Sequence, residues 1–158
     1  MKAEMMHTTT SDGYRMDGAF FDARTSSDNR LVDAVLMIHG SGGKFYTPIL
    51  LHFAERLRDS GYSSLSLNTM GHDTVWMGEG GSTLHGNAFE ILGRSPSDIR
   101  SGIDWLASKG YSKIGLLGRS MGAVKVLYYS AIEKDPRVTA IIAASPVLLS
   151  YSHYMKPE

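Results

Sequence analysis

The stretch Gly115–Val126, "GLLGRSMGAVKV", decides how the chain is expected to fold. A short apolar run over 113–118 ends at a glycine, which is typical of a strand buried on both faces. Residues 121–134, "MGAVKVLYYSAIEK", are predicted to form a helix. The sequence therefore predicts a strand, a sharp turn and a helix, with Ser120 in the turn between two glycines.

Further strands are predicted on both sides of this stretch. A continuous apolar run predicts a buried strand at Ala34–Gly40. Further strands are predicted at Ser63–Asn68 and Val138–Ala144. The alternating, turn-rich segment Thr8–Ala23 predicts two short antiparallel strands. Residues Met70–Gly93 show little periodicity, and a loop of that length in a compact domain is usually functional.

Two more helices are predicted between these strands. The first is expected from Pro48, with Thr47 as its N-cap, to a stop at Gly61. The second is expected to follow Ser95 as N-cap, with Pro96 as its first residue. Their buried stripes are predicted to be Ile49, Phe53 and Leu57 in the first, and Ile99, Ile103 and Leu106 in the second. Strands alternating with helices predict an α/β fold, with a doubly wound, mostly parallel sheet and helices on both faces.

Length and composition point to one domain and exclude several function classes. A chain of 158 residues with 42% apolar residues is expected to form a single domain over 1–158. Sixteen basic residues balance sixteen acidic ones, so we expect neither a nucleic-acid nor an anionic-membrane partner. The absence of cysteine excludes disulfides, thiolate zinc sites and a cysteine nucleophile.

Location and cofactors follow from the same composition. The N-terminal residues 1–13 contain no apolar signal-peptide core, and apolar runs such as Val138–Ala144 are too short to cross a bilayer. We therefore expect a cytoplasmic protein. The histidines are scattered, without a His-x-x-x-His pair or a carboxylate cluster, so no metal site is predicted, and no cofactor is expected.

Ser120 has the surroundings of a nucleophilic serine. A Gly-x-Ser-x-Gly pattern between a buried strand and a helix is the context of a nucleophile elbow. The glycines remove side chains that would clash in so sharp a turn, and the start of the helix favours developing negative charge. The competing interpretation is a glycine-rich turn that only lets the strand and helix pack closely.

The turn His39–Gly43, "HGSGG", follows the first buried strand and is a candidate oxyanion site. Backbone N–H groups in such a turn can stabilise an oxyanion at the ligand-binding edge of the sheet. We expect Ser41 to supply one N–H group, with Gly42 as the alternative, and Met121 to supply the other. Dinucleotide and Walker phosphate loops are excluded, because Phe45 stands where those motifs need a glycine or a Ser/Thr. His39 itself is expected to be a packed structural histidine.

Together these features resemble the α/β-hydrolase superfamily, in its serine esterase and dienelactone-hydrolase-like branch. The match consists of "LMIHGSGG" (36–43), "LSLNTMGHD" (65–73) and "IGLLGRSMGA" (114–123), and it extends from about Ala34 to Pro146. The resemblance implies a serine hydrolase that cleaves a carboxylic ester or thioester through an acyl-enzyme on Ser120.

The resemblance also implies a catalytic acid after a seventh strand and a histidine after an eighth. The chain ends just after what would be the sixth strand, so we expect an N-terminal portion of the fold without its acid and histidine. After Ser120 the sequence contains one histidine, His153, and three carboxylates, Glu133, Asp135 and Glu158. Asp135 is expected to point away from the carboxyl edge of the sheet, and His153 to be a solvated loop residue.

The long loop Met70–Gly93 contains two histidines that precede the nucleophile, and apolar residues occur in and before this loop. His72 and His85 could line a pocket, but the resemblance gives neither the role of the base. A set of apolar residues could form an acyl pocket, although such residues more often belong to the core: Phe45, Tyr46, Trp76, Met77 and Phe89.

Alternative functions remain open at this point. The fold could serve a non-catalytic binding or scaffold protein, or another reaction such as acyl transfer, carbon–carbon hydrolysis or perhydrolysis. A strand at Val138–Ala144 with no strand after it would leave an uncharged sheet edge, so self-association through this edge is also expected.

Overall fold

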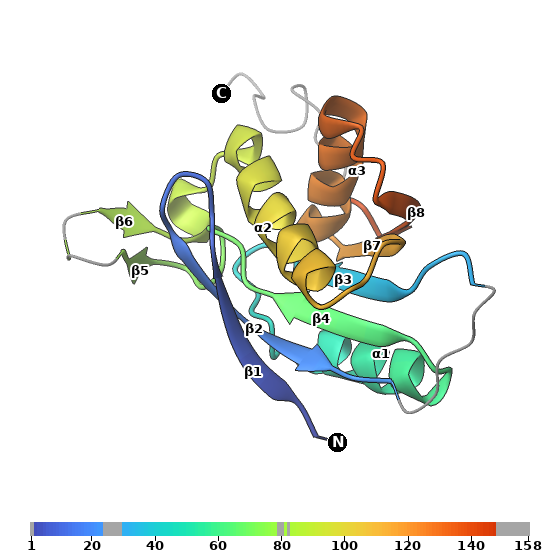
Figure 1. The fold of residues 1–158 in the computed structure, drawn as a ribbon. Helices are drawn as coiled ribbons and strands as arrows, with labels where there is room; N and C mark the ends of the chain where they lie inside the picture. The colour runs from blue at the N-terminus through green and yellow to red at the C-terminus, as the bar shows by residue number, and fades with distance from the viewer. Residues whose placement is uncertain (1, 24–29, 79–80, 82, 148–158) are drawn as a thin grey trace.

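A central sheet organises the molecule in the computed structural model, which describes residues 2–23, 30–78, 81 and 83–147. Among these residues, six strands form one sheet in the order β1-β2-β4-β3-β7-β8 (Figure 1). The strands are β1 (Glu4–Thr9), β2 (Arg15–Phe21), β3 (Ala34–Ile38), β4 (Ser63–Leu67), β7 (Ile114–Arg119) and β8 (Val138–Ala144). β4, β3, β7 and β8 run parallel, and β1 and β2 are antiparallel. The predicted mostly parallel sheet is confirmed.

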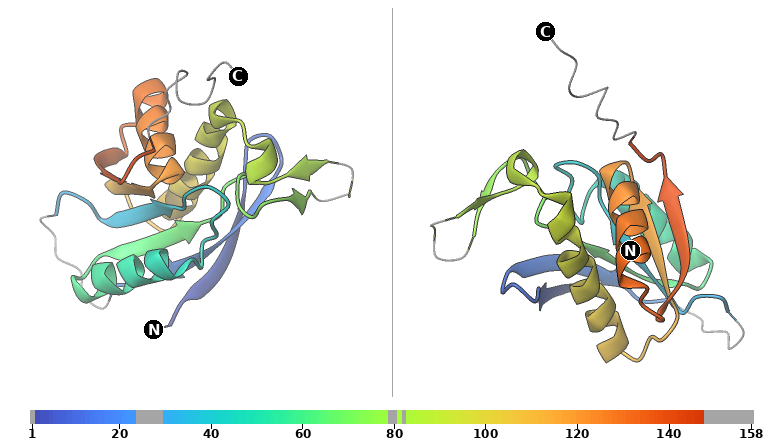
Figure 2. Two further views of the ribbon diagram at one scale, coloured as in Figure 1. Left: turned by 180° about the vertical axis from the view of Figure 1, so that it is seen from behind. Right: turned by 90° about the horizontal axis from the view of Figure 1, so that it is seen from above.

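Helices cover both faces of this sheet, as Figure 2 shows. They are α1 (Pro48–Asp59), α2 (Ser95–Ser108) and α3 (Met121–Glu133). Alternate residues of β3 enter two separate cores: Leu36 and Ile38 pack in the core under α2 and α3, and Val35 and Met37 pack in the core under α1. Because both faces of β3 are covered, the strand is apolar throughout.

The predicted helix starts and one buried stripe need correction. Thr47 precedes α1 but makes no side-chain capping bond, because its Oγ1 accepts the N–H of Lys44 at 3.0 Å instead. Ser95 lies inside α2, where its hydroxyl donates to the Leu92 carbonyl at 2.8 Å. The fully buried positions of α1 are Leu50 and Ala54, one residue away from the predicted stripe, whose members are partly buried: Ile49, Phe53 and Leu57. The predicted stripe of α2 is confirmed.

The segment Met70–Gly93 is more ordered than its sequence suggests. It contains a two-stranded hairpin and two 3₁₀ helices: β5 (Trp76–Met77), β6 (Leu84–His85), η1 (Asn87–Phe89) and η2 (Leu92–Arg94). The Met70 carbonyl accepts the indole N–H of Trp76 and the N–H of Gly86, both at 3.0 Å. The Met70 N–H donates to Asp98 at 2.9 Å. These bonds fasten the hairpin base to α2.

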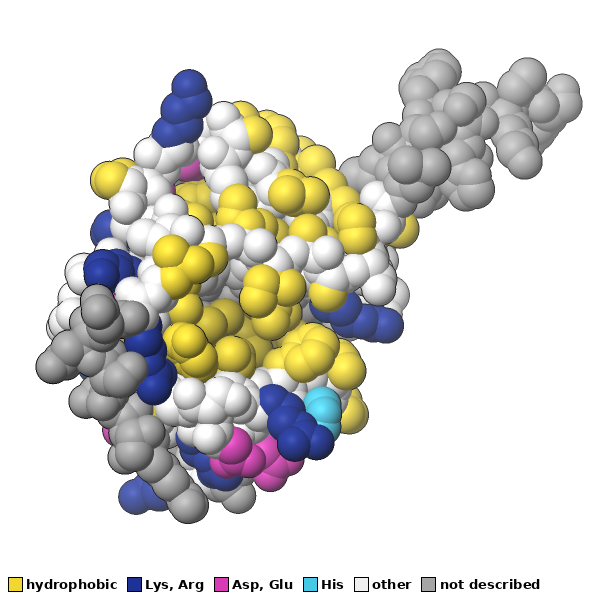
Figure 3. Space-filling view, turned by 90° about the vertical axis from the view of Figure 1, so that its right-hand side faces the viewer, with side chains coloured by type: hydrophobic (Ala, Val, Ile, Leu, Met, Phe, Trp, Pro, Cys, Tyr) yellow, Lys and Arg dark blue, Asp and Glu magenta, His cyan; other side chains and the backbone are white. Residues whose placement is uncertain are grey.

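The far edge of the sheet is β8, which pairs with β7 alone among the described strands. Apolar side chains gather on the side of the molecule where α3 and β8 lie (Figure 3). Ile141 and Ile142 on β8 are 41% and 53% exposed, and Leu127 and Ile132 on α3 are exposed as well. This β8–α3 face therefore presents apolar surface to its surroundings.

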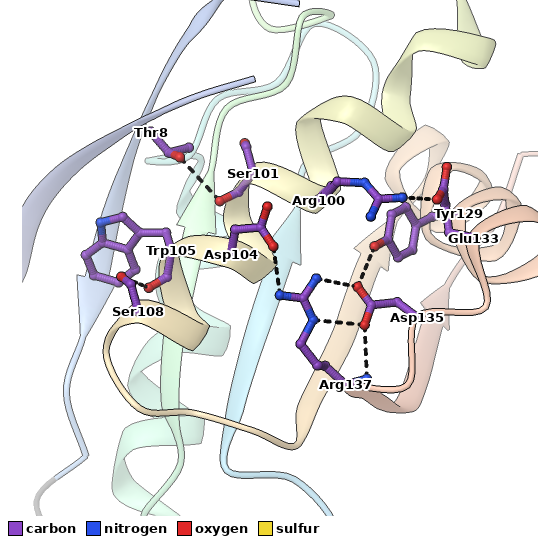
Figure 4. A network of polar contacts seen from close by, with 10 residues as sticks. All are labelled: Thr8, Arg100, Ser101, Asp104, Trp105, Ser108, Tyr129, Glu133, Asp135 and Arg137. Atoms are coloured by element: carbon purple, nitrogen blue, oxygen red, sulfur yellow. Dashed lines mark hydrogen bonds and ion pairs between the residues drawn. The ribbon is translucent and has the colours of Figure 1, made fainter. Parts of the chain in front are cut away.

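A polar network joins α2, α3 and the residues just before β8 (Figure 4). It lies at the amino-terminal ends of the parallel strands, whereas Ser120 follows the carboxyl end of β7. Arg137 donates to Asp135 at 2.6 Å and to Asp104 at 2.7 Å, and the Tyr129 hydroxyl donates to Asp135 at 3.0 Å. The bonds from Arg137 lower the pKa of Asp135 to about 2. Asp135 thus lies away from the carboxyl edge of the sheet, as expected.

Within the described residues, none of the helices has the length and apolar character that crossing a membrane requires.

Candidate active site

Ser120 occupies a strained turn between β7 and α3. Its φ of 56° and ψ of −121° place it in a region that residues with a side chain rarely adopt. The turn is fixed on both sides, because the Ser120 N–H donates to Ala144 at 2.9 Å and its carbonyl accepts the N–H of Ala123 at 3.0 Å. Such strain persists where the surrounding structure holds it, and it is common at functional sites.

The two glycines beside Ser120 are required by close packing. A Cβ on Gly118 would overlap the carbonyl oxygen of Gly122. A Cβ on Gly122 would lie 2.5 Å from the carbonyl oxygen of His39. The sequence interpretation that these positions exclude side chains is therefore correct, and the pattern has a geometric cause.

The structure brings the predicted oxyanion turn next to the serine. β3 and β7 are parallel neighbours with Ile38 opposite Gly118, so the residues that follow the two strands meet at the carboxyl edge. A Cβ on Gly40 would lie 3.0 Å from Ser120 Cβ and 3.5 Å from Ser120 Oγ. Ser41 follows Gly40 in the chain, so the peptide that carries the Ser41 N–H starts at a residue in contact with Ser120.

Ser41 and Gly42, the two candidate N–H donors of the oxyanion turn, lie in different surroundings. Gly42 has a φ of 59°, and a Cβ there would contact the Asp73 carbonyl oxygen at 3.6 Å and Asn87 Cβ at 3.7 Å. In the described part of the chain, no carbonyl accepts the N–H of Ser41, nor that of Met121 at the start of α3. The oxyanion roles of Ser41, of its alternative Gly42 and of Met121 stay predictions.

His39 is a buried, fully bonded side chain. Its Nδ1 lies 2.7 Å from the Gly40 carbonyl oxygen, and its Nε2 lies 3.1 Å from the Thr69 N–H nitrogen. A carbonyl can only accept and an amide N–H can only donate, so Nδ1 carries the proton and Nε2 accepts. Burial, aided by the nearby Lys125, lowers the pKa of His39 to about 3. His39 is thus a neutral structural residue, as expected.

His72 belongs to a separate cluster on the same edge of the sheet. Its Nδ1 lies 2.8 Å from a carboxylate oxygen of Asp73, whose other oxygen pairs with Lys44 at 2.6 Å. The Lys44 contact is the largest cause of a lowered pKa for Asp73. The imidazole stacks on Trp76, with ring centroids 4.7 Å apart. The Asp73 carboxylate and the Trp76 ring thus orient the His72 imidazole, which does not hydrogen-bond to Ser120.

The base and acid of a triad are not brought to Ser120. Among residues 2–23, 30–78, 81 and 83–147, no imidazole or carboxylate hydrogen-bonds to its hydroxyl. His153 lies outside the described residues. Within the described part, no group of three or more metal-binding side chains occurs. Tyr46, Met77 and Phe89 are half exposed or more, so an acyl pocket lined by them stays a prediction.

Sequence reasoning missed a buried polar cluster behind the serine. Lys125 on α3 is fully buried, forms an ion pair with Glu90 and donates to Thr69 Oγ1 at 2.9 Å. The available signal was spacing, because a residue three after Gly122 and four before Tyr129 lies on the buried face of the helix.

Asp98 is a second buried group that the sequence did not indicate. One carboxylate oxygen accepts the Met70 N–H, while the other has no partner among the described residues. Both this oxygen and the unpartnered Nε2 of His85 belong to residues that line a cavity of about 20 Å³. Burial raises the pKa of Asp98 to about 7.

Solved structures of α/β hydrolases and esterases share this fold. The α/β hydrolase GrgF from Penicillium sp. sh18 matches with a TM-score of 0.75 and 20% identity, over 96% of this chain and 48% of its own. The Pyrococcus furiosus esterase Pf2001 matches with a TM-score of 0.69 and 20% identity, over 92% and 52%. Est1E from Butyrivibrio proteoclasticus, solved with ferulic acid bound, matches with a TM-score of 0.69 and 20% identity, over 88% and 52%.

These matches establish the fold and its extent. The chain has the α/β-hydrolase fold, as an N-terminal portion that spans about half the length of the structures it matches. At sequence identities near 20%, these matches support a shared fold alone. No protein-family model matches the chain, and no curated protein matches it by sequence.

Proposed function

We propose that this chain carries the nucleophile and oxyanion site of a serine hydrolase that cleaves a carboxylic ester or thioester. The observation that carries the proposal is the backbone of Ser120, which is held at φ 56° between β7 and α3. A serine without this role would gain stability by leaving such a conformation. The fold shared with known esterases supports the same conclusion.

The reaction would proceed through an acyl-enzyme. Ser120 Oγ attacks the carbonyl carbon while a base takes the hydroxyl proton, and the carbonyl oxygen becomes an oxyanion. The N–H groups of Ser41 and Met121 would donate to this oxyanion. The tetrahedral intermediate expels the alcohol or thiol, which receives the proton from the base. Water then attacks the acyl-enzyme by the same steps and releases the acid.

The proposal requires an imidazole and a carboxylate that the described residues do not place beside Ser120. We therefore assign them to polypeptide outside those residues. A serine hydroxyl without a base is a weak nucleophile at neutral pH. A small external base in solution should replace part of this function. A cytoplasmic location stays a prediction from the sequence.

Labelling with a fluorophosphonate in the presence of added imidazole tests the proposal. We expect phosphonylation of Ser120 at a rate that rises with the imidazole concentration, because imidazole substitutes for the missing base. Ser120→Ala should abolish the labelling. Ser108→Ala removes an exposed serine from α2 and serves as the matched control, with unchanged labelling. Equal labelling of the wild type and Ser120→Ala would refute the proposal.

A second candidate is a non-catalytic binding or scaffold protein with the same fold. The absence of a base beside Ser120 among the described residues favours it. In that case imidazole would not accelerate labelling of Ser120 over that of exposed serines. The experiment above separates the two candidates, because they predict opposite responses to imidazole.

A further inference from the structure

We infer that Lys125 is a positioning residue for the Ser41 N–H group and acts on it through Thr69 and His39. The inference rests on the proposed function, because it assigns the Ser41 N–H to the oxyanion. It concerns side chains that do not touch the substrate. Three successive contacts, Lys125 to Thr69, Thr69 to His39 and His39 to Gly40, connect the buried lysine with the Gly40–Ser41 peptide.

The first contacts fix the direction of each hydrogen bond. Lys125 Nζ can only donate, so Thr69 Oγ1, 2.9 Å away, accepts from it. The Thr69 hydroxyl proton is then free to point to His39 Nε2, which lies 3.3 Å from Thr69 Oγ1. The Thr69 N–H donates to the same nitrogen at 3.1 Å. His39 Nε2 thus faces two donors and cannot carry a proton.

The tautomer of His39 then determines its contact with the oxyanion turn. With Nε2 unprotonated, the proton of the neutral ring lies on Nδ1 and is donated to the Gly40 carbonyl at 2.7 Å. The Gly43 N–H donates to the same carbonyl at 3.0 Å. The other tautomer would place two lone pairs against each other at Gly40 and two protons against each other at Thr69.

Holding the Gly40 carbonyl also orients the Ser41 N–H. The two groups belong to one planar trans peptide unit and point in opposite directions. The carbonyl is held by His39 and Gly43, so rotation of this peptide would break two hydrogen bonds. Gly40, whose carbonyl belongs to this peptide unit, lies against Ser120, because a Cβ on Gly40 would be 3.0 Å from Ser120 Cβ. An oxyanion donor is effective when it is oriented before the reaction.

Burial makes this chain of contacts stiff. Lys125 and Thr69 are fully buried, and His39 is 1% exposed. Glu90 forms an ion pair with Lys125 and packs so closely that a Cβ on Gly71 would overlap its carboxylate. Donation by a lysine polarises the threonine hydroxyl and strengthens its bond to His39. The low pKa of His39 is consistent with this arrangement.

Two substitutions at Thr69 separate hydrogen bonding from packing. Thr69→Val keeps the shape but removes the hydroxyl, whereas Thr69→Ser keeps the hydroxyl and serves as the matched control. Lys125→Met removes the first donor, and the double variant Lys125→Met/Glu90→Gln avoids leaving a buried carboxylate without its partner. Two quantities are measured on the 158-residue chain: the nitrogen chemical shifts of the His39 ring by NMR, and the imidazole-dependent rate of Ser120 phosphonylation.

We expect the wild type and Thr69→Ser to show the Nδ1–H tautomer and equal labelling rates. Thr69→Val and the Lys125 variants should keep this tautomer, because the Thr69 backbone N–H still donates to His39 Nε2. They should shift the Nε2 signal, since the hydroxyl donor is lost or weakened, and label Ser120 at least about tenfold more slowly, since the oxyanion donor is less firmly held. Wild-type ring signals and rates in folded Thr69→Val would overturn the inference, whatever happens to the Lys125 variants.

The two readouts also separate this inference from the proposed function. A wild type that does not label at Ser120 refutes the proposed function and, with it, the oxyanion role of Ser41. Labelling of the wild type with unchanged variants refutes the positioning role of Lys125 alone. An equal loss in Thr69→Ser and Thr69→Val would assign the effect to packing and likewise contradict the inference.

Discussion

Gly122 lies directly against His39, because a Cβ on Gly122 would be 2.5 Å from the His39 carbonyl oxygen. This contact joins the first turn of α3, which follows the nucleophile, to the end of β3, which leads into the oxyanion turn. The distance between the two candidate parts of the site is therefore set by a glycine. Any side chain at this position must push them apart.

Gly122→Ala should destabilise the protein by about 3 kcal/mol, because the backbone atoms it meets cannot yield without moving β3 or α3. Urea unfolding followed by circular dichroism measures this change. Gly93→Ala is the matched control, since the nearest atom to a Cβ there is the Tyr128 hydroxyl at 4.0 Å. The control should stay within about 0.5 kcal/mol of the wild type. Equal stability of both variants would contradict the packing argument.

Ser120→Gly should be more stable than Ser120→Ala by about 1 kcal/mol, because glycine adopts φ 56° without strain. Thermal unfolding of the two variants measures the difference. Ser130, within the C-terminal part of α3, is the control, for which the opposite order of stability is expected. In that regular helix, glycine should be less stable than alanine by about 1 kcal/mol. The same order at both positions would show that Ser120 is not strained.

Asp98→Asn should raise the stability at pH 8 by on the order of 3 kcal/mol. The folded pKa of Asp98, about 7, lies above the ordinary aspartate value of 3.8, so ionisation of this carboxyl costs stability as pH rises between these values. The amide keeps an acceptor for the Met70 N–H and has no charge to bury. The difference from the wild type should be small near pH 4, grow with pH and become constant above about pH 7.

Denaturant unfolding at several pH values measures this difference. The lowered pKa of His39 acts in the opposite direction and costs stability as pH falls from 6.5 toward 3. Comparing Asp98→Asn with the wild type at each pH removes that contribution, because both chains contain His39. A difference that does not change with pH would contradict the raised pKa of Asp98.

Self-association through β8 is expected, because this edge strand is uncharged and two of its isoleucines are exposed. Sedimentation velocity at increasing concentration should show the wild type shifting to dimers or larger species. Ile142→Lys places a charge on the edge and should restore the monomer. Leu84→Lys alters a similarly exposed side chain on the β5–β6 hairpin and should leave association unchanged. A wild type that stays monomeric would contradict the prediction.

The parts of the fold that depend on neighbouring residues could be predicted from the sequence. The turn at Ser120 follows from the two glycines beside it, and the buried strands β3 and β7 follow from their apolar runs. Contacts between distant segments could not be predicted. The pairing of Lys125 with Glu90, and the burial of Asp98 under the Met70 turn, depend on how α2, α3 and the hairpin pack together.

Local hydrogen bonds also limited the prediction of details. Thr47 occupies the cap position of α1, yet its hydroxyl bonds to Lys44, which competes for it in the preceding turn. Likewise, the sequence leaves Gly42 as the alternative donor to Ser41, and it does not indicate that Gly42 has a positive φ and lies near Asp73. Backbone direction at single residues in a glycine-rich turn depends on tertiary contacts that periodicity does not describe.

The most direct test of the central claim is the mass spectrometric location of the acyl group after incubation with an activated ester or thioester and imidazole. The account predicts a single acyl adduct that maps to Ser120, is absent from Ser120→Ala and is lost as the acid product accumulates. Acyl groups spread over exposed serines and lysines, at equal levels in the wild type and Ser120→Ala, would contradict it.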